Sequence, residues 1–113
     1  MSRTLLNEIG NTPIVKSIAL NSNPNVKLYF KLEGNNPGGS VKDRAAYNMI
    51  KTALDSKKIS TSTKLIEATS GNTGIALAMA AAIRGYRLIL IMPSHMSSER
   101  KLSMAAYGAE LIE

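Results

Sequence analysis

The segment from residue 64 to residue 92 constrains the fold of this chain more than any other. Two short apolar runs of strand length, KLIEA at 64–68 and RLILIM at 87–92, stand at its ends. Between them, the small-residue turn TSGNTG opens onto IALAMAAAIRGY, which predicts a helix from about Thr73 to a left-handed cap at Gly85. Two buried strands joined by a helix are typical of a crossover between parallel strands.

The flanking segments continue this alternation of strands and helices. VKLYFKL at 26–32 alternates apolar and polar residues, as a strand with one buried face does, and a helix-spaced apolar pattern begins near Ser40. A further helix is predicted from Ser97 to about Tyr107, and the strand-like AELIE at 109–113 follows it. The chain is therefore predicted to be an α/β protein, with a parallel sheet and crossover helices.

Length and charge narrow the function classes. At 113 residues, with 44% hydrophobic and 19% charged residues, the chain is expected to fold as one modest globular domain. The net charge of +6 is spread along the sequence without interleaved aromatic residues, which argues against nucleic-acid binding. The longest apolar run, at 75–83, is too short to span a bilayer, and the N-terminus lacks the apolar core of a signal peptide. We therefore expect no membrane partner and a cytoplasmic location.

The residue types of the chain do not favour a metal-binding site. The chain has no cysteine and a single histidine, His95 in a polar turn, so we expect no metal site. The carboxylates of Asp43 and Glu67 are expected to serve a helix dipole and local hydrogen bonds, without a catalytic role. Two motifs remain as candidates for chemistry.

The first motif, EGNNPGGSVKDR at 33–44, delivers a lysine into the first turn of a helix. A phosphate-binding P-loop also places a lysine after glycines, but Ser40 and Val41 occupy the positions where that motif needs lysine and serine or threonine. The helix dipole disfavours an ammonium group at the N-terminus and favours the neutral amine that attacks an aldehyde. Lys42 is therefore a candidate Schiff-base nucleophile, and an exposed surface lysine is the alternative that spacing leaves open.

The second motif, EATSGNTG at 67–74, joins a predicted strand to a predicted helix. Backbone N–H groups at the helix start and the hydroxyls of Thr69, Ser70 and Thr73 form a natural cradle for a carboxylate or phosphate. Its glycines do not give the G-x-G-x-x-G spacing of a dinucleotide site. The motif predicts an anion-binding turn, with an ordinary capped turn as the open alternative.

Taken together, the two motifs resemble a known enzyme family. NNPGGSVKDRAA and EATSGNTGIALAMAAAIRGY are similar to the lysine segment and the asparagine loop of cysteine synthases (O-acetylserine sulfhydrylases), which are pyridoxal-phosphate (PLP) enzymes of fold type II. GNTP near the start, LIMPSHMSSERK and AYGAELI extend the resemblance over nearly the whole chain, and the pattern is closer to the B-type than to the A-type enzymes. The resemblance implies the N-terminal part of the tryptophan synthase β-like PLP fold.

The resemblance also implies roles for individual residues. Lys42 matches the lysine that forms the Schiff base with PLP and later moves the proton of the substrate's Cα. Asn72 matches the asparagine that hydrogen-bonds the ring hydroxyl of the cofactor. The residues that match the loop closing over the substrate's α-carboxylate are Thr69, Ser70, Gly71 and Thr73.

The implied reaction is a β-replacement that forms L-cysteine from O-acetyl-L-serine and sulfide or thiosulfate. These residues neither select the sulfur donor nor exclude O-phosphoserine as the acceptor. A cystathionine β-synthase or a serine/threonine dehydratase of the same fold type is the alternative enzyme interpretation. The non-catalytic interpretation is a truncated copy of such an enzyme that only folds or self-associates.

The resemblance further implies that residues 1–113 are the N-terminal portion of such an enzyme. Residues 1–35 are expected to belong with a larger domain and residues 36–113 with a smaller one, and the complete enzyme is expected to be a homodimer. The phosphate-binding loop and the serine at the pyridine nitrogen lie beyond Glu113 in family members. We therefore expect the isolated chain to bind PLP weakly and to have little synthase activity.

Overall fold

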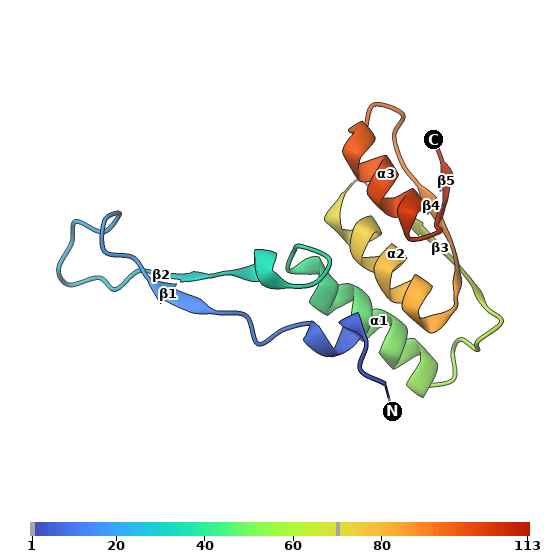
Figure 1. Cartoon of the computed structure of the whole chain (residues 1–113), viewed down its shortest axis with the longest axis horizontal. Coiled ribbons are helices and arrows are strands. Elements are labelled where there is room, and N and C mark those ends of the chain that lie inside the picture. The colour runs from blue at the N-terminus through green and yellow to red at the C-terminus, as the bar shows by residue number, and fades with distance from the viewer. Residues whose placement is uncertain (1, 70) are drawn as a thin grey trace.

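The computed structural model describes residues 2–69 and 71–113. In this part of the chain, a sheet and three helices form a body from which a two-stranded hairpin projects (Figure 1). The elements of the body are α1 (Lys42–Asp55), β3 (Lys64–Ala68), α2 (Asn72–Arg84), β4 (Arg87–Ile91), α3 (Ser98–Ala106) and β5 (Glu110–Ile112). The elements of the N-terminal segment are the 3-10 helix η1 (Leu5–Glu8), the hairpin strands β1 (Ile14–Lys16) and β2 (Tyr29–Lys31), and the 3-10 helix η2 (Glu33–Asn35).

The sheet of the body is parallel, with its strands in the order β3-β4-β5. Leu65 stands opposite Leu88, and Leu90 stands opposite Leu111. Helices α2 and α3 connect consecutive strands, as parallel neighbours require. The predicted alternation of strands and helices from residue 64 onward is therefore confirmed, and the chain is an α/β protein.

The core lies between the sheet and its helices. Helix α2 is buried along most of its length, as its apolar sequence predicts, and ends at Gly85, whose φ of 77° is left-handed. Met79, Leu90 and Met104 come from three different elements and are fully buried. Burial of one such side chain contributes about 1.5–3 kcal/mol. Within the described ranges, no helix is long and apolar enough to cross a bilayer.

Figure 1 shows all three helices of the body on one face of the sheet. No other described element covers the opposite face, on which Ile66, Ile91 and Ile112 are 60%, 43% and 45% exposed. The same face carries the charged side chains of Lys64, Arg87 and Glu110 toward its other parts. Ile91 and Ile112 are paired across neighbouring strands, so their side chains form one continuous patch. An exposed apolar patch of this kind is typical of a surface that further protein covers.

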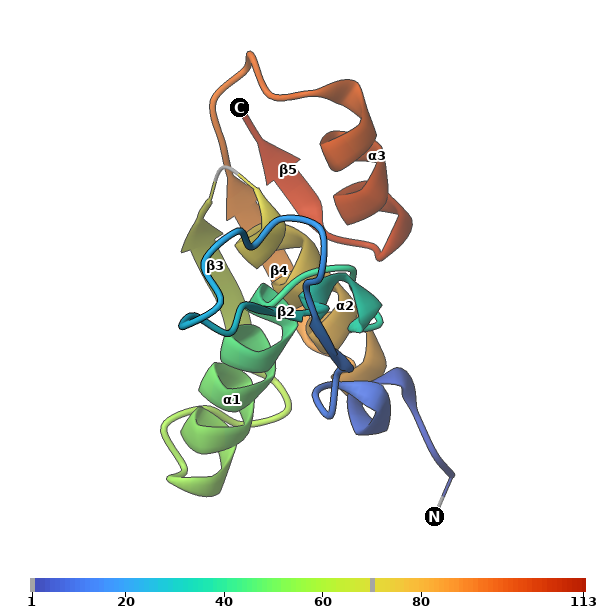
Figure 2. The same cartoon turned by 90° about the vertical axis from the view of Figure 1, so that its left-hand side faces the viewer.

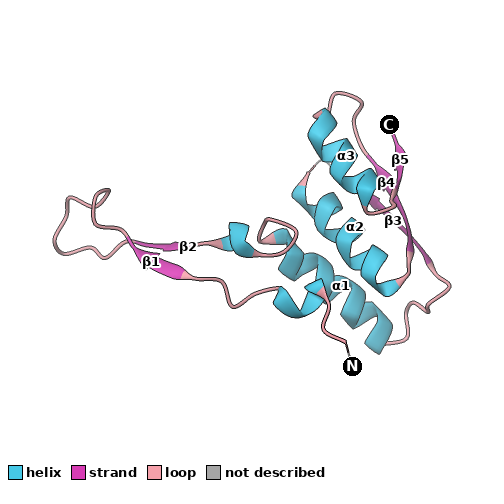
Figure 3. Ribbon diagram, viewed as in Figure 1, coloured by secondary structure: helices cyan, strands magenta, loops and turns pink. Residues whose placement is uncertain are grey.

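The predicted strand at 26–32 differs from the structure in two respects. Only Tyr29–Lys31 (β2) is a strand, and it pairs antiparallel with β1 instead of joining the parallel sheet (Figure 3). The expectation of one buried face was also wrong, because both strands of the hairpin are exposed throughout. An alternating pattern identifies a strand that is suited to one buried face, whereas burial itself depends on what packs against that face.

Candidate active site

Lys42 is the first residue of α1, two positions after the predicted helix start at Ser40. The hydroxyl oxygen of Ser40 accepts a hydrogen bond from the Lys42 backbone N–H at 3.1 Å, which satisfies one of the unpaired amides of the helix start. The side chain of Lys42 is exposed, and its Nζ has no hydrogen bond or ion pair with any described residue. The candidate nucleophile is therefore an accessible amine at a helix N-terminus.

The next residue, Asp43, is buried instead, with only 1% of its surface exposed. Its Oδ2 accepts a hydrogen bond from the backbone N–H of Gly38 at 2.5 Å, whereas its Oδ1 has no partner in the described chain. Burial raises the pKa of the Asp43 carboxyl above its usual value, and the hydrogen bond from Gly38 opposes this effect. Asp43 makes a local hydrogen bond as predicted, but the sequence did not indicate its burial.

A polar network fixes the segment that precedes the lysine. Glu33 accepts hydrogen bonds from the side chains of Arg44 at 3.1 Å and Asn36 at 2.6 Å. Thr12 donates to Glu33 at 3.2 Å and accepts from Arg44 at 3.3 Å, and Asn36 accepts from the N–H of Gly10 at 2.8 Å. The hydrogen bond from Arg44 holds the pKa of Glu33 below its usual value. The GNTP segment and the lysine motif therefore form one connected unit, which sequence reasoning missed.

The predicted anion-binding turn lies between β3 and α2. The Oγ1 atom of Thr69 accepts hydrogen bonds from the N–H groups of Gly71 at 3.5 Å and Gly74 at 3.1 Å. The amides of Asn72 and Thr73 have no acceptor among the described residues, so two donors at the start of α2 are available to an anion. Ser70, which the sequence also assigned to this loop, lies outside the described residues.

Two glycines of this turn differ in their surroundings. A Cβ on Gly74 would lie 2.6 Å from Cγ2 of Thr69 and 2.8 Å from Cε of Met104, closer than carbon atoms approach one another. A Cβ on Gly71 would lie 3.7 Å from the guanidinium group of Arg100, which is an ordinary contact. Gly74 is therefore needed for close packing, and Arg100 brings a positive charge beside the turn. Sequence patterns do not indicate the position of Arg100, because its proximity to the turn arises only from the packing of α3.

Lys42 and the turn at 69–74 lie at the same end of the body. Helices α1 and α2 pack against each other, and Figures 1 and 2 show that they run in the same direction, with the start of α2 beside the carboxyl end of β3. This end of a parallel sheet is where α/β proteins commonly bind ligands. A shallow depression of about 440 Å³ opens there and is lined by Thr69 together with Ala68, Ile91, Met92 and Pro93. The structure thus brings the two motifs together, while the roles assigned to their residues stay predictions.

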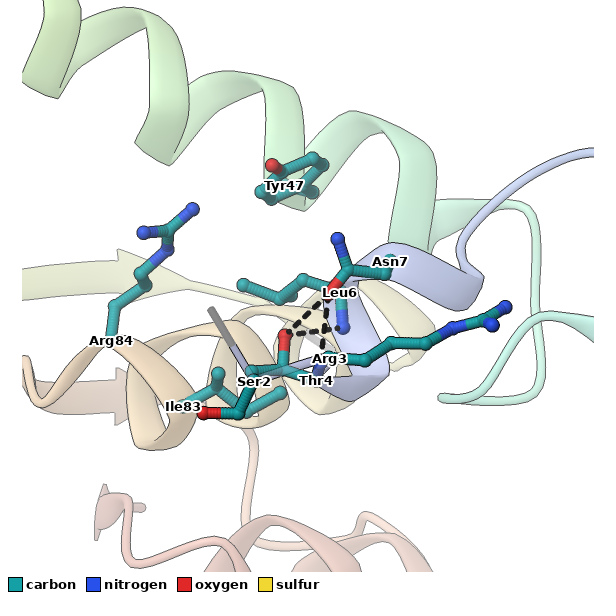
Figure 4. Close-up of a pocket in the computed structure, with 8 residues that line it drawn as sticks. All are labelled: Ser2, Arg3, Thr4, Leu6, Asn7, Tyr47, Ile83 and Arg84. Atoms are coloured by element: carbon teal, nitrogen blue, oxygen red, sulfur yellow. Dashed lines mark hydrogen bonds between the residues drawn. The ribbon is translucent and has the colours of Figure 1, made fainter.

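A second cavity, of about 570 Å³, lies away from the motifs. Figure 4 shows it between η1, α1 and the C-terminal end of α2, with Tyr47 and Arg84 on its walls. Arg84 ends α2, and at about 1.5 Å per residue it lies roughly 18 Å along the helix from Asn72. No motif residue is among those that line this cavity, which are Ser2, Arg3, Thr4, Leu6, Asn7, Tyr47, Ile83 and Arg84.

The accessible lysine and the turn predicted to bind an anion both lie on an α/β fold, an arrangement that is compatible with an anionic ligand carrying a carbonyl group. Residues 5–113 match the family model of the pyridoxal-phosphate dependent enzymes, which covers nearly the whole chain. The chain belongs to this family of PLP-dependent enzymes.

Individual relatives narrow the comparison. The chain is 59% identical to cysteine synthase B of Pseudomonas syringae pv. syringae over 110 residues, and 59% identical to cysteine synthase B of Salmonella typhimurium over 109 residues. These matches cover 97% and 96% of this chain, but 65% and 36% of the two relatives. Among solved structures, a hydrogen sulfide-producing enzyme from Fusobacterium nucleatum superposes with a TM-score of 0.92 at 48% identity, covering 99% of this chain and 37% of that enzyme. The chain thus spans only part of the length of these relatives.

The described residues fit part of a PLP molecule. The amine of Lys42, which has no partner in the described part of the chain, would bind the aldehyde of the cofactor. The exposed side chain of Asn72 offers an amide donor for a ring hydroxyl, and the backbone amides of Asn72 and Thr73 suit an anionic group. PLP is the cofactor that the family uses, and these donors agree with it.

Proposed function

We propose that the protein is a PLP-dependent cysteine synthase that forms L-cysteine from O-acetyl-L-serine and a sulfur donor by β-replacement. The observation that carries this proposal is the 59% identity with cysteine synthase B proteins over nearly the whole chain. The placement of Lys42 and the turn at 69–74 at one end of the body supports it.

The proposed roles follow from the chemistry of each group. Lys42 binds the cofactor and later moves the proton at the substrate's Cα, because its amine is accessible and free of other described partners. Bound PLP supplies an electron sink for the negative charge that develops at Cα. Asn72 donates a hydrogen bond to the ring hydroxyl of the cofactor. The residues proposed to hold the substrate's α-carboxylate are Thr69, Ser70, Gly71 and Thr73.

We further propose that residues 1–35 belong with a larger domain and residues 36–113 with a smaller one. The hairpin supports this division, because Ile14, Ile18 and Leu20 are 63%, 90% and 75% exposed and the hairpin projects from the body (Figure 1). A two-stranded ribbon is marginally stable in water on its own, so we infer that further protein covers it. We also propose that the complete enzyme is a cytoplasmic homodimer.

The visible absorption spectrum of the purified chain with added PLP tests the assignment of Lys42. We expect a band from lysine-bound cofactor that disappears in Lys42→Ala. Lys51→Ala is the matched control, because Lys51 is an exposed lysine of the same helix that pairs with Asp55 at 3.7 Å. A band of unchanged strength in Lys42→Ala would refute the assignment.

A substrate screen tests the reaction. Cysteine formation from O-acetyl-L-serine and sulfide indicates the synthase, cystathionine formation indicates the first alternative enzyme, and deamination of serine or threonine indicates the second. Because the chain spans 36% of the Salmonella typhimurium relative, we propose that the 113-residue chain has little of this activity by itself. Substantial turnover by a verified 113-residue species would contradict that part of the proposal.

A further inference from the structure

Asp43 occupies an unfavourable environment for a carboxylate. It is 1% exposed, one of its oxygens has a single hydrogen bond, and the other is buried without a described partner. A buried acceptor without a partner destabilises a fold, and a buried charge does so more strongly. A neutral or apolar side chain of similar size is often at least as stable in such a place. A negative charge in the first turn of α1 interacts favourably with the helix dipole, but the burial of an oxygen without a described partner opposes this gain. Stability alone is therefore a weak reason for an aspartate at this position.

The one hydrogen bond that the Asp43 carboxyl makes with the described residues closes a short loop around the candidate nucleophile. Because its Oδ2 binds the N–H of Gly38, residues 38–43 form a ring that contains Lys42. Inside this ring, Ser40 accepts hydrogen bonds from the N–H groups of Lys42 at 3.1 Å and Asp43 at 3.3 Å. A Cβ on Gly38 would collide with the carboxylate of Asp43, so only glycine permits this approach.

The residue after Asp43 holds the same turn from another direction. Arg44 is paired with Glu33 at 3.1 Å, and Glu33 is bound in turn to Thr12 and Asn36. The first turn of α1 is thus anchored by two consecutive side chains. Lys42, the residue before them, is exposed, and its amine has no partner among the described residues.

We propose that Asp43 is a positioning residue for Lys42. Its buried carboxylate accepts the hydrogen bond from the backbone N–H of Gly38 and so fixes the first turn of α1. The lysine is thereby held in one position beside the turn at 69–74. This inference rests on the proposed role of Lys42 and adds a residue through which that role is supported. Asp43 itself touches neither cofactor nor substrate in this proposal.

The test measures how fast PLP labels each lysine of the 113-residue chain. PLP is added, the adducts are reduced with borohydride, and peptide mass spectrometry compares the label at Lys42 with the label at the remaining lysines. The variants are Asp43→Ala, which removes the acceptor, and Asp43→Asn, which keeps an acceptor of the same shape. Asp55→Ala is the matched control, because it removes an exposed aspartate from the same helix.

We expect Asp43→Ala to lower the labelling of Lys42, relative to the other lysines, about five- to tenfold, as the loss of one hydrogen bond implies. Asp43→Asn and Asp55→Ala should keep the wild-type ratio within about twofold. Wild-type labelling of Lys42 in Asp43→Ala overturns the positioning role and leaves the proposed function standing.

Amide hydrogen exchange supplies a second readout that does not involve the cofactor. In Asp43→Ala we expect faster exchange in residues 38–44 and unchanged exchange in β4 and α2, since the effect is confined to one turn. Exchange that is unchanged, or faster throughout the chain, overturns the proposal. A wild-type chain without any preference for labelling at Lys42 would contradict the proposed cofactor attachment instead, and the exchange result would then decide the positioning role.

Discussion

The hydroxyl oxygen of Thr69 accepts a hydrogen bond from the backbone N–H of Gly74 at 3.1 Å, which ties the end of β3 to the first turn of α2. The methyl group of the same threonine fills the space that a side chain on Gly74 would need. Thr69 therefore shapes the turn at 69–74 through both its polar and its apolar atoms. The amides of Asn72 and Thr73, between these two contacts, remain without described acceptors.

Gly74→Ala should destabilise this turn. The added methyl group would overpack against Thr69 and Met104, so we expect the free energy of unfolding to fall by about 1–3 kcal/mol. Urea denaturation followed by circular dichroism measures the change. Gly34→Ala is the matched control, because the nearest atom to its new Cβ would be 4.0 Å away. A similar loss in both variants would show that close packing at Gly74 is not the cause.

The body of the fold could be predicted because its elements are defined locally. The strand at 64–68 and the helix at 72–84 each show a local pattern of apolar residues. Gly85 ends the helix because its backbone is left-handed. The hairpin could not be predicted in the same way. Strand β1 has only three residues, and it is a strand because it pairs with β2, with Val15 opposite Phe30. Such pairing depends on contacts between distant positions, which a local pattern does not report.

The candidate site could be predicted in part for the same reason. Lys42 and Asn72 are the first residues of α1 and α2, and the turn motifs before them predict both helix starts from the sequence. The network around Glu33 could not be found, because its partners Arg44 and Thr12 lie 11 and 21 positions away. The burial of Asp43 also depends on tertiary packing, although the glycine pair before Ser40 is a signal that something approaches the backbone closely.

Glu33→Gln should change how stability depends on pH. The hydrogen bond from Arg44 lowers the pKa of Glu33 from its ordinary value of 4.5, so the folded state binds the proton less readily than the unfolded state. The resulting stabilisation is complete above that value and is lost as the pH falls through the lowered pKa. Urea denaturation at a series of pH values should show the wild type more stable than the variant near neutral pH, and the two converging below 4.5. A difference that stays constant with pH would contradict this explanation.

Asp43→Asn should show the opposite trend. Burial raises the pKa of Asp43 from its ordinary value of 3.8, so the folded state binds the proton more readily than the unfolded state. The associated stabilisation is present below 3.8 and is lost as the pH rises through the raised pKa. Relative to the uncharged variant, the wild type should therefore lose stability between pH 3.8 and neutrality in the same denaturation series. Asp55→Asn controls for the loss of one carboxylate, and a wild type that gains on Asp43→Asn over this range would refute the prediction.

Leu90 and Ile91 are neighbours in β4, and their side chains lie on opposite faces of the sheet. Replacing each by alanine therefore compares the face that the helices cover with the bare face, which no described helix covers. Leu90 is fully buried, and Leu90→Ala should lower the free energy of unfolding by about 2–5 kcal/mol through lost burial and the cavity left behind. Ile91 is 43% exposed, so Ile91→Ala should cost roughly 1 kcal/mol, because part of its surface is already in water.

The concentration dependence of this comparison shows whether the bare face is covered in solution. If the patch of Ile66, Ile91 and Ile112 remains in contact with water, the cost of Ile91→Ala should be the same at every protein concentration. If a second copy of the chain covers the patch, that cost should rise with concentration, and Ile91→Lys should shift sedimentation toward the monomer. A cost for Ile91→Ala as large as that for Leu90→Ala, independent of concentration, would mean that β4 is buried on both faces within one chain.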